Sequence, residues 1–274
     1  MKIALIQQHA TEDYEDNIRR GLAAFRKAAE AGADLVAVAE LAFLPFLPQR
    51  RATPEALERA ESIPGPTTER FAPLCREYGI VAVLNVFESA KEGTFDSSPV
   101  IDADGSLLGV TRMVHIMDGH GFYEKGFYHP GNSMRYVYET KVGRVGVAIC
   151  YDRHYPEYMR NLGLLGAELV VVPQAGSMGE WPDGVFEAEL QIAAFQNGYF
   201  AALANRVGKE EFLHFSGESF VVDPFGKVIA RAPQGEDCIL YSDLDFDLIS
   251  QCSAKNFFLK DRRPDFYKSF ALFE

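Results

Sequence analysis

Short apolar runs alternate with amphipathic stretches along the first part of the chain. Residues 2–8 and 34–39 are apolar and β-rich, and between them apolar side chains recur at helical spacing over 18–29, up to Gly32. An apolar strand on each side of an amphipathic helix is typical of a βαβ unit, whose parallel strands are covered on both faces. The chain is therefore predicted to begin as an α/β fold.

The same alternation returns further along the chain. We expect a helix over residues 67–78, weakened by Pro73, and a strand over 80–87. A second series of strands and helices is predicted over residues 145–149, 156–165, 169–173, 186–197 and 200–204. The pattern predicts one mixed-sheet α/β domain over residues 1–274, and it is compatible with an internal duplication.

Turn residues predict hairpins in two regions. Asp104-Gly105 would join strands over 99–102 and 106–111, and the last part of the chain would hold successive strands with hairpin turns, over 219–222, 227–230 and 239–243. In contrast, residues 112–133 are rich in Gly and His and follow neither period. A long irregular segment inside a compact domain is typical of a functional loop.

Composition and charge narrow the classes of partner. The 274 residues are 47% hydrophobic and 24% charged, which is enough chain for one substantial core. Lys and Arg number 27 against 39 Asp and Glu, so the net charge of −12 would repel nucleic acid and anionic membrane surfaces. The cysteines lie far apart without a CxxC pair, and no leader-like segment precedes the first strand. We expect a reduced, cytoplasmic protein without a membrane-spanning segment.

Two polar residues stand at the carboxyl ends of predicted buried strands, where open α/β sheets bind their ligands. Glu40 ends the run DLVAVAE, and partial desolvation there would raise its pKa toward that of a general base, although a helix cap or a salt bridge is an alternative. Cys150 ends VGVAIC, and Pro156 predicts a sharp strand-to-helix turn after it. A helix amino terminus and a nearby cation would favour the nucleophilic thiolate there, whereas a buried strand cysteine is more often inert.

Other chemistries find no support in the sequence. The histidines of the 112–133 segment are irregularly spaced, and neither HxxxH nor HExxH occurs, so we expect no metal. G-x-S-x-G, Walker and G-x-G-x-x-G motifs are also absent, so we expect neither a serine nucleophile nor a phosphate-bearing cofactor.

A series of motifs, in order over nearly the whole chain, resembles the nitrilase superfamily of carbon-nitrogen hydrolases: ADLVAVAELAFLP, RMVHIMDGHGFYEKGFYHPGN, VGVAICYDRHYPE, AAFQNGYFAALANRVG, FSGESFVVDPFGKVIA and DRRPDFY. The resemblance implies an α-β-β-α sandwich that forms a homodimer or higher homo-oligomer. It also implies a covalent reaction on a small amide or N-carbamoyl substrate, with Cys150 as nucleophile, Glu40 as general base and Glu124 as a second glutamate that orients the site.

One position departs from the family pattern. The catalytic lysine of the family lies in an R-K-x-H pattern, and this chain has Met113 in its place. A thioether cannot donate a hydrogen bond to an oxyanion, and losing one such donor costs about a hundred- to a thousandfold in rate. Three outcomes follow: His115, Arg112 or Lys125 substitutes, backbone N–H groups after Cys150 suffice, or the protein is a catalytically impaired binding or scaffold protein. We favour reduced or altered activity, because the other polar groups of the site are kept.

Residues that follow the predicted nucleophile indicate the class of substrate. Arg153 resembles the arginine with which N-carbamoyl amino acid and ureidopropionate branches hold a substrate carboxylate, a task that suits a planar guanidinium. A surface pair of Arg153 with Asp152 or Glu157 is the alternative. Tyr151 and His115, within the same motifs, are further candidates for substrate binding.

Overall fold

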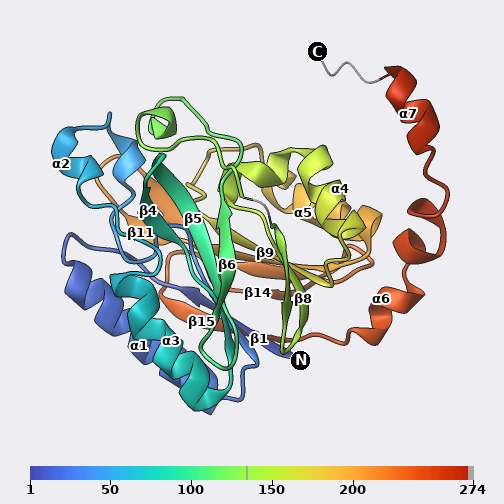
Figure 1. The fold of residues 1–274 in the computed structure, drawn as a ribbon, viewed down its shortest axis with the longest axis horizontal. Helices are drawn as coiled ribbons and strands as arrows, with labels where there is room; N and C mark the ends of the chain where they lie inside the picture. The colour runs from blue at the N-terminus through green and yellow to red at the C-terminus, as the bar shows by residue number, and fades with distance from the viewer. Residues whose placement is uncertain (134, 271–274) are drawn as a thin grey trace.

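Two mixed β-sheets pack face to face in the computed structural model, which describes residues 1–133 and 135–270 (Figure 1). The first sheet has the order β15-β1-β2-β3-β5-β4, and β6 also pairs with β5. Its strands are β1 (Lys2–Gln7), β2 (Leu35–Val38), β3 (Val81–Val83), β4 (Val86–Ala90), β5 (Gly93–Ile101), β6 (Leu107–Arg112) and β15 (Cys238–Asp243). The second sheet has the order β14-β13-β10-β9-β8-β7, from β7 (Val137–Thr140), β8 (Gly143–Val147), β9 (Leu169–Gln174), β10 (Phe200–Asn205), β13 (Phe220–Val222) and β14 (Val228–Arg231). A separate small ladder joins β11 (Val207–Lys209) to β12 (His214–Ser216).

Helices cover the outer face of each sheet. The first sheet packs against α1 (Tyr14–Glu30) and α3 (Pro66–Tyr78), and the second against α4 (Pro156–Leu164) and α5 (Val185–Asn197) (Figure 1). One apolar cluster lies between the sheets and two more lie under the helix pairs, so the layers are those of the predicted α-β-β-α sandwich. The remaining helical segments are α2 (Pro54–Leu57), α6 (Asp247–Gln251), α7 (Pro264–Phe270), the 3-10 turns Leu47–Gln49, Glu124–Gly126 and Cys150–His154, and a π-helical turn at Ala254–Phe258.

The helix ends follow from local chemistry. The side chain of Asp13 accepts a hydrogen bond from the Asp16 backbone N–H and so caps α1. Gly79 ends α3 at a φ of 66°, in the left-handed region that favours glycine. Pro73 lies inside α3, as the sequence indicated, and burial of Phe71 and Leu74 beside it offsets the missing hydrogen bond.

Two strand predictions need correction. The strand expected over 80–87 is divided into β3 and β4, although both run antiparallel to β5 in one register, with Val83 opposite Val100 and Val86 opposite Ser97. The division falls at residues 84–85, between β3 and β4. There, the side chain of Asn85 forms hydrogen bonds with Leu41 N and with Asp96 Oδ1, which belong to the site described below. The last strand, β15, pairs with β1 of the first sheet and not with its predecessor β14, because turn residues mark a reversal without specifying the partner.

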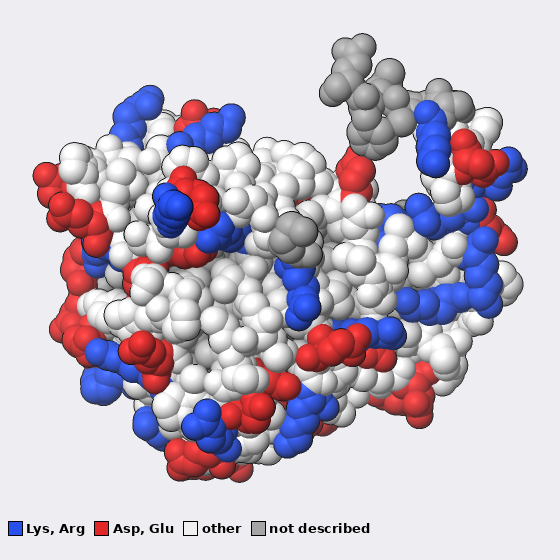
Figure 2. Space-filling view, in the orientation of Figure 1, with Lys and Arg blue, Asp and Glu red and all other residues white. Residues whose placement is uncertain are grey.

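Charged side chains do not form a continuous basic surface on the face shown in Figure 2. Lys and Arg are interspersed there with Asp and Glu, mostly around a less charged centre. None of the helices within the described residues is long and apolar enough to cross a membrane.

Candidate active site

Cys150 lies where β8 runs into the turn that precedes α4. It opens the 3-10 turn Cys150–His154, and its φ of 42° is in the left-handed region that non-glycine residues rarely adopt. Such backbone strain is concentrated at functional sites, where the surrounding structure holds it in place. Cys150 is only 6% exposed, with its sulfur facing the space between the two sheets.

The sulfur of Cys150 has polar neighbours on several sides. Gln174 Nε2 lies 3.2 Å from Sγ, and the backbone N–H of Ala175 donates to it. The charge of the Glu40 carboxyl group also acts on the sulfur. Burial, followed by the negative charges of Glu40 and Glu124, raises the pKa of the Cys150 thiol well above its ordinary value. The expected stabilisation of the thiolate by a cation is therefore wrong for the free site, and a base has to remove the proton.

Glu40 follows β2 and is fully buried. Leu41 N donates to Asn85 Oδ1 over 2.7 Å, and Arg206 Nη1 donates to the Glu40 carbonyl oxygen over 2.9 Å, so the chain is held on both sides of this strand end. Among residues 1–133 and 135–270, no group forms a hydrogen bond with either carboxyl oxygen of Glu40, so the helix cap and the salt bridge considered for it are not formed. Burial, then the charges of Asp96 and Glu124, raises the pKa of Glu40 well above its ordinary value, as the strand-end position predicted.

Glu124 reaches the same site from the long 112–133 segment. It lies in the 3-10 turn Glu124–Gly126, is 1% exposed and accepts a hydrogen bond from Met117 N over 3.1 Å. Burial raises the pKa of Glu124 well above its ordinary value despite this hydrogen bond. The structure thus brings Glu40, Glu124 and Cys150 together from three separate parts of the chain.

Met113 directly follows β6 and is fully buried, in the apolar cluster that also contains Cys150. Its backbone N–H donates to the Asp96 carbonyl oxygen over 2.9 Å. Two of the predicted substitutes for a lysine face elsewhere, because Arg112 is paired with Glu88 at 2.6 Å and Lys125 is exposed.

His115, the third predicted substitute, is held by a buried carboxylate. Its Nδ1 lies 2.7 Å from Asp152 Oδ1, and its ring stacks on Tyr155 with centroids 3.5 Å apart. Tyr151 is half-buried and meets His154 and Tyr155 edge-on. These aromatic contacts place both predicted substrate-binding residues, His115 and Tyr151, on one wall beside the cysteine turn.

Arg153 is buried and paired with a residue that the sequence did not indicate. Its Nη1 lies 2.7 Å from Glu189 Oε2, which corrects the expected pairing with Asp152 or Glu157. Its Nε donates to Gln174 Oε1 over 3.1 Å, so the guanidinium orients the amide that contacts the Cys150 sulfur. Arg153 Nη2 is buried without a hydrogen-bond partner.

Several polar residues of the site were not indicated by the sequence, among them Asn85 and Gln174, described above, and also Asp96 and Tyr128. Asp96, on β5, is fully buried and accepts a hydrogen bond from Asn85 Nδ2 over 2.6 Å. The hydroxyl of Tyr128 is buried without a partner, and the charges of Asp96, Glu40, Glu124 and Cys150 all act on it. Extending the Asp104-Gly105 hairpin further would have brought Asp96 next to Met113, whereas no local pattern marks Tyr128.

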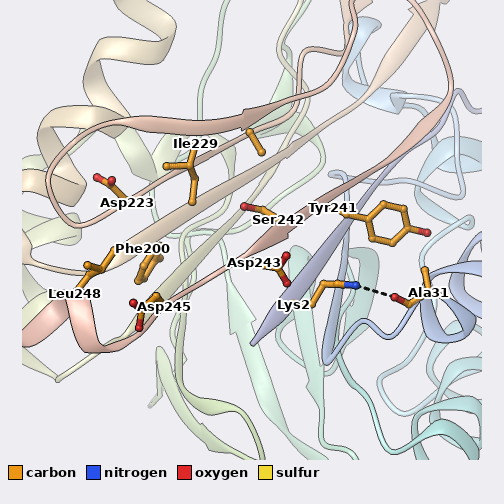
Figure 3. A pocket seen from close by; sticks show the side chains of 11 residues that line it. Lys2, Ala31, Phe200, Asp223, Ile229, Tyr241, Ser242, Asp243, Asp245 and Leu248 are labelled. Carbon is orange, nitrogen blue, oxygen red and sulfur yellow. Dashed lines mark hydrogen bonds between the residues drawn. The ribbon is translucent and has the colours of Figure 1, made fainter.

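Two hollows in the surface differ in their relation to this site. One of about 430 Å³ is lined by loop residues 177–184, including Glu180, whose charge acts on both Cys150 and Glu124. Another, of about 600 Å³, is lined by Lys2, Asp243 and Asp245 among others, and none of the site residues described above lines it (Figure 3). Of these two hollows, the first is therefore the one linked to the site, through Glu180. Among the described residues, no three His, Cys, Asp or Glu side chains are grouped as metal ligands.

Known proteins share this sequence and architecture. A family model described as carbon-nitrogen hydrolase matches residues 2–254. The chain is 34% identical over 280 residues to an N-carbamoylputrescine amidase of Solanum lycopersicum, with 97% of this chain and 93% of the relative covered. A solved carbon-nitrogen hydrolase from Helicobacter pylori G27 superposes with a TM-score of 0.91 at 28% identity, over 98% of each chain. A solved variant of the amidase from Nesterenkonia sp. AN1 superposes with a TM-score of 0.81 at 26% identity, over 98% of this chain and 96% of that one. That variant carries the acetamide moiety of fluoroacetamide on its active site cysteine. This chain belongs to the carbon-nitrogen hydrolase family of the nitrilase superfamily.

Proposed function

We propose that this protein hydrolyses the carbon-nitrogen bond of a small amide or N-carbamoyl compound through a covalent intermediate on Cys150. The observation that carries this proposal is the placement of Cys150, on its strained turn, in one buried site with the carboxyl groups of Glu40 and Glu124. The covalently modified cysteine of the Nesterenkonia amidase and the name of the tomato relative support the two classes of substrate. The comparisons do not favour the alternative of an impaired binding or scaffold protein.

The chemistry follows from the order of these groups. Glu40 takes the proton of the Cys150 thiol, and the sulfur attacks the carbonyl carbon. When the tetrahedral species collapses, the carbon-nitrogen bond breaks and the leaving nitrogen receives the proton from Glu40. Water, activated by the same carboxylate, then hydrolyses the thioester. Glu124, held by Met117 N, orients the base and the substrate from the opposite side.

The substrate preference depends on Arg153. Its charge is offset by Glu189, while its buried Nη2 is free to donate. We therefore keep binding of a substrate carboxylate as its proposed second role, with Tyr151 and His115 contacting the rest of the substrate. Glu180, in the neighbouring hollow, opposes a strong preference for anions.

A homodimer or higher homo-oligomer is proposed as well. Apolar side chains on and next to α4 and α5 are unusually exposed, among them Leu165 at 58% and Ile192 at 52%. Ile192 and Val185 line a groove of about 340 Å³ between the two helices, which a second copy of the chain would cover. All four cysteines are free thiols, and the cytoplasm remains our prediction for where the protein works.

Intact-mass spectrometry tests the proposed function. The protein is incubated with matched amide, N-carbamoyl and nitrile compounds, and both the released ammonia or amine and the protein mass are measured. We expect turnover, with an acyl or carbamoyl adduct on Cys150, for at least one amide or carbamoyl compound. Neither turnover nor an adduct with any member would contradict the proposal.

Introducing the missing lysine by Met113→Lys should raise hydrolysis of an amide or carbamoyl substrate by about tenfold or more, because it adds a cationic donor to the site. The new ammonium would be fully buried, and the carboxyl groups of Asp96 and Glu40 beside it supply the counter-charge that it needs. The measurement is kcat/KM of parent and variant, with a thermal melt to show that the variant is folded.

A folded Met113→Lys variant without any gain would mean that another donor already serves the oxyanion. The unpaired hydroxyl of Tyr128 is then the first residue to test and His115 the second. Tyr128→Phe should in that case lower kcat by about ten- to a hundredfold. Tyr138→Phe is the matched control, because that buried hydroxyl binds Thr111 away from the site. A fast parent that is slowed by Met113→Lys would show that Met113 is no deficit.

A further inference from the structure

Asn85 links two fully buried acids, Glu40 and Asp96. Its Oδ1 accepts a hydrogen bond from Leu41 N, next to Glu40, and its Nδ2 donates to Asp96 Oδ1 over 2.6 Å. Among the described residues, neither oxygen of Glu40 nor Asp96 Oδ2 has a hydrogen-bond partner. Two buried carboxylates that no donor satisfies repel one another, and a proton on the pair removes that repulsion. The geometry therefore calls for a proton on this pair.

In the described part of the chain, the surroundings of the pair contain further acids and no strong cationic partner. The charge of Glu124 acts on Glu40, and that of Asp152 acts on Asp96. The Tyr128 hydroxyl is under the influence of both acids, and the Cys150 thiol lies on the side of Glu40. Met113, next to Asp96 across the strand pair, is neutral. Arg206 donates to the backbone of Glu40 and Leu41, and its charge is paired with Glu210.

We propose that Glu40 and Asp96 work as a single base that shares one proton in the resting site, with Asp96 as the acceptor behind Glu40. This inference rests on the proposed function and explains how it can proceed from a protonated Glu40. Asp96 touches no reacting atom, so it is a positioning residue that acts through Glu40. In a site without a lysine, the pair takes up the proton that the thiol releases.

The proposed step balances in protons and charge. The S–H bond of Cys150 breaks and its proton binds one oxygen of Glu40, while the proton already on Glu40 moves to Asp96 Oδ2. The sulfur forms its bond to the carbonyl carbon, and the carbonyl π electrons move to the oxygen. The negative charge of the pair has then become the charge of the tetrahedral oxyanion. On collapse, the leaving nitrogen takes a proton from Glu40, and Asp96 returns its proton to Glu40.

Asp96→Asn tests this inference through the pH profile of kcat/KM. The amide keeps an oxygen for Asn85 and offers an N–H group to Glu40, so it imitates a permanently protonated Asp96. Burial raises the pKa of Asp96 to about 6 and that of Glu40 further above its ordinary value. Asp96→Asn removes the more acidic member of the pair, so activity at low pH then depends on the higher pKa of Glu40 alone. The acid limb of the profile should therefore move to higher pH by about one unit or more, and kcat at pH 7 should fall by about tenfold or more.

A matched control removes a buried carboxylate that lies outside the pair. Glu88, on β4, is 5% exposed and binds Arg112 and Ser97. Glu88→Gln should leave the acid limb where it is in the parent. If Asp96→Asn fails to fold, Asp96→Ser takes its place, because a hydroxyl cannot take up the proton either and must cause the same shift.

The outcomes separate this inference from the proposed function. A folded variant at Asp96 with an unmoved acid limb and parental kcat would overturn the shared base while the hydrolase reading stands. A fall in kcat without any shift of the limb would show that Asp96 is merely structural, and would overturn the inference too. If the parent protein itself neither turns over nor forms an adduct, it is the proposed function that fails.

Discussion

Cys150→Ala should abolish hydrolysis and adduct formation together, a loss of about a thousandfold or more in kcat. The reason is that the covalent intermediate needs the sulfur, and no other cysteine stands beside Glu40 and Glu124. The fold should survive, because the alanine keeps Cβ and removes only the single sulfur atom from a site that already contains polar groups. The measurements are turnover and intact mass with the best substrate of the panel.

Cys238→Ala is the matched control for the nucleophile. Cys238 is a partly exposed free thiol at the start of β15, away from the site, so this variant should keep parental turnover and its adduct. Cys75 is less suitable, because it is fully buried on the inner face of α3 and its loss would destabilise the core. Unchanged activity in Cys150→Ala would remove the nucleophile from the proposed mechanism.

Glu40→Gln should retain the fold and lower kcat by about a hundred- to ten-thousandfold. The amide has the shape of the carboxyl group but cannot accept the thiol proton, and it cannot activate water in the second half of the reaction. Cys150 should remain available to a haloacetamide, which reacts without turnover. A Glu40→Gln variant with parental kcat at every pH would show that the proton goes elsewhere.

The same variant has an effect on stability with a defined sign. Burial raises the pKa of Glu40 well above its ordinary value of 4.5, so the folded protein binds this proton more tightly than the unfolded chain does. The stabilisation is complete below the ordinary pKa and is lost as the pH rises through the raised one, by roughly 1 kcal/mol per pH unit. A glutamine does not ionise, so the Glu40→Gln variant does not lose stability in this way as the pH rises. The melting temperature of the variant minus that of the parent should therefore increase from pH 5 to pH 8.

The alternation of short apolar runs and amphipathic stretches was enough to predict a mixed-sheet α/β domain, and the resemblance to the family added the expectation of α-β-β-α layers. The strand ends at Glu40 and Cys150 were also readable, because parallel buried strands present their carboxyl ends at one edge of a sheet. The irregular 112–133 segment stood out for its lack of period, and it brings Glu124 to the site. These features depend on the order of residues over a few turns or strands, which a single sequence displays directly.

The direction of the Cys150 pKa was not readable in this way. The sequence indicated a helix start and a nearby cation, both of which favour the thiolate. In the fold, the cation of Arg153 is paired with Glu189, and the sulfur is buried beside Glu40 and Glu124. A pKa depends on the sum of burial and all neighbouring charges, so it follows only when every neighbour is known.

By itself, the sequence determined the fold class, the two strand-end residues and the presence of Met113 where the family resemblance predicts a lysine. Only the tertiary structure decided which acids surround that methionine. Asp96 reaches Glu40 because β5 continues well past the predicted hairpin and Asn85 interrupts the neighbouring strand to bind it. Strand length, register and burial result from packing between distant segments, so they cannot be predicted from the local propensities of the residues.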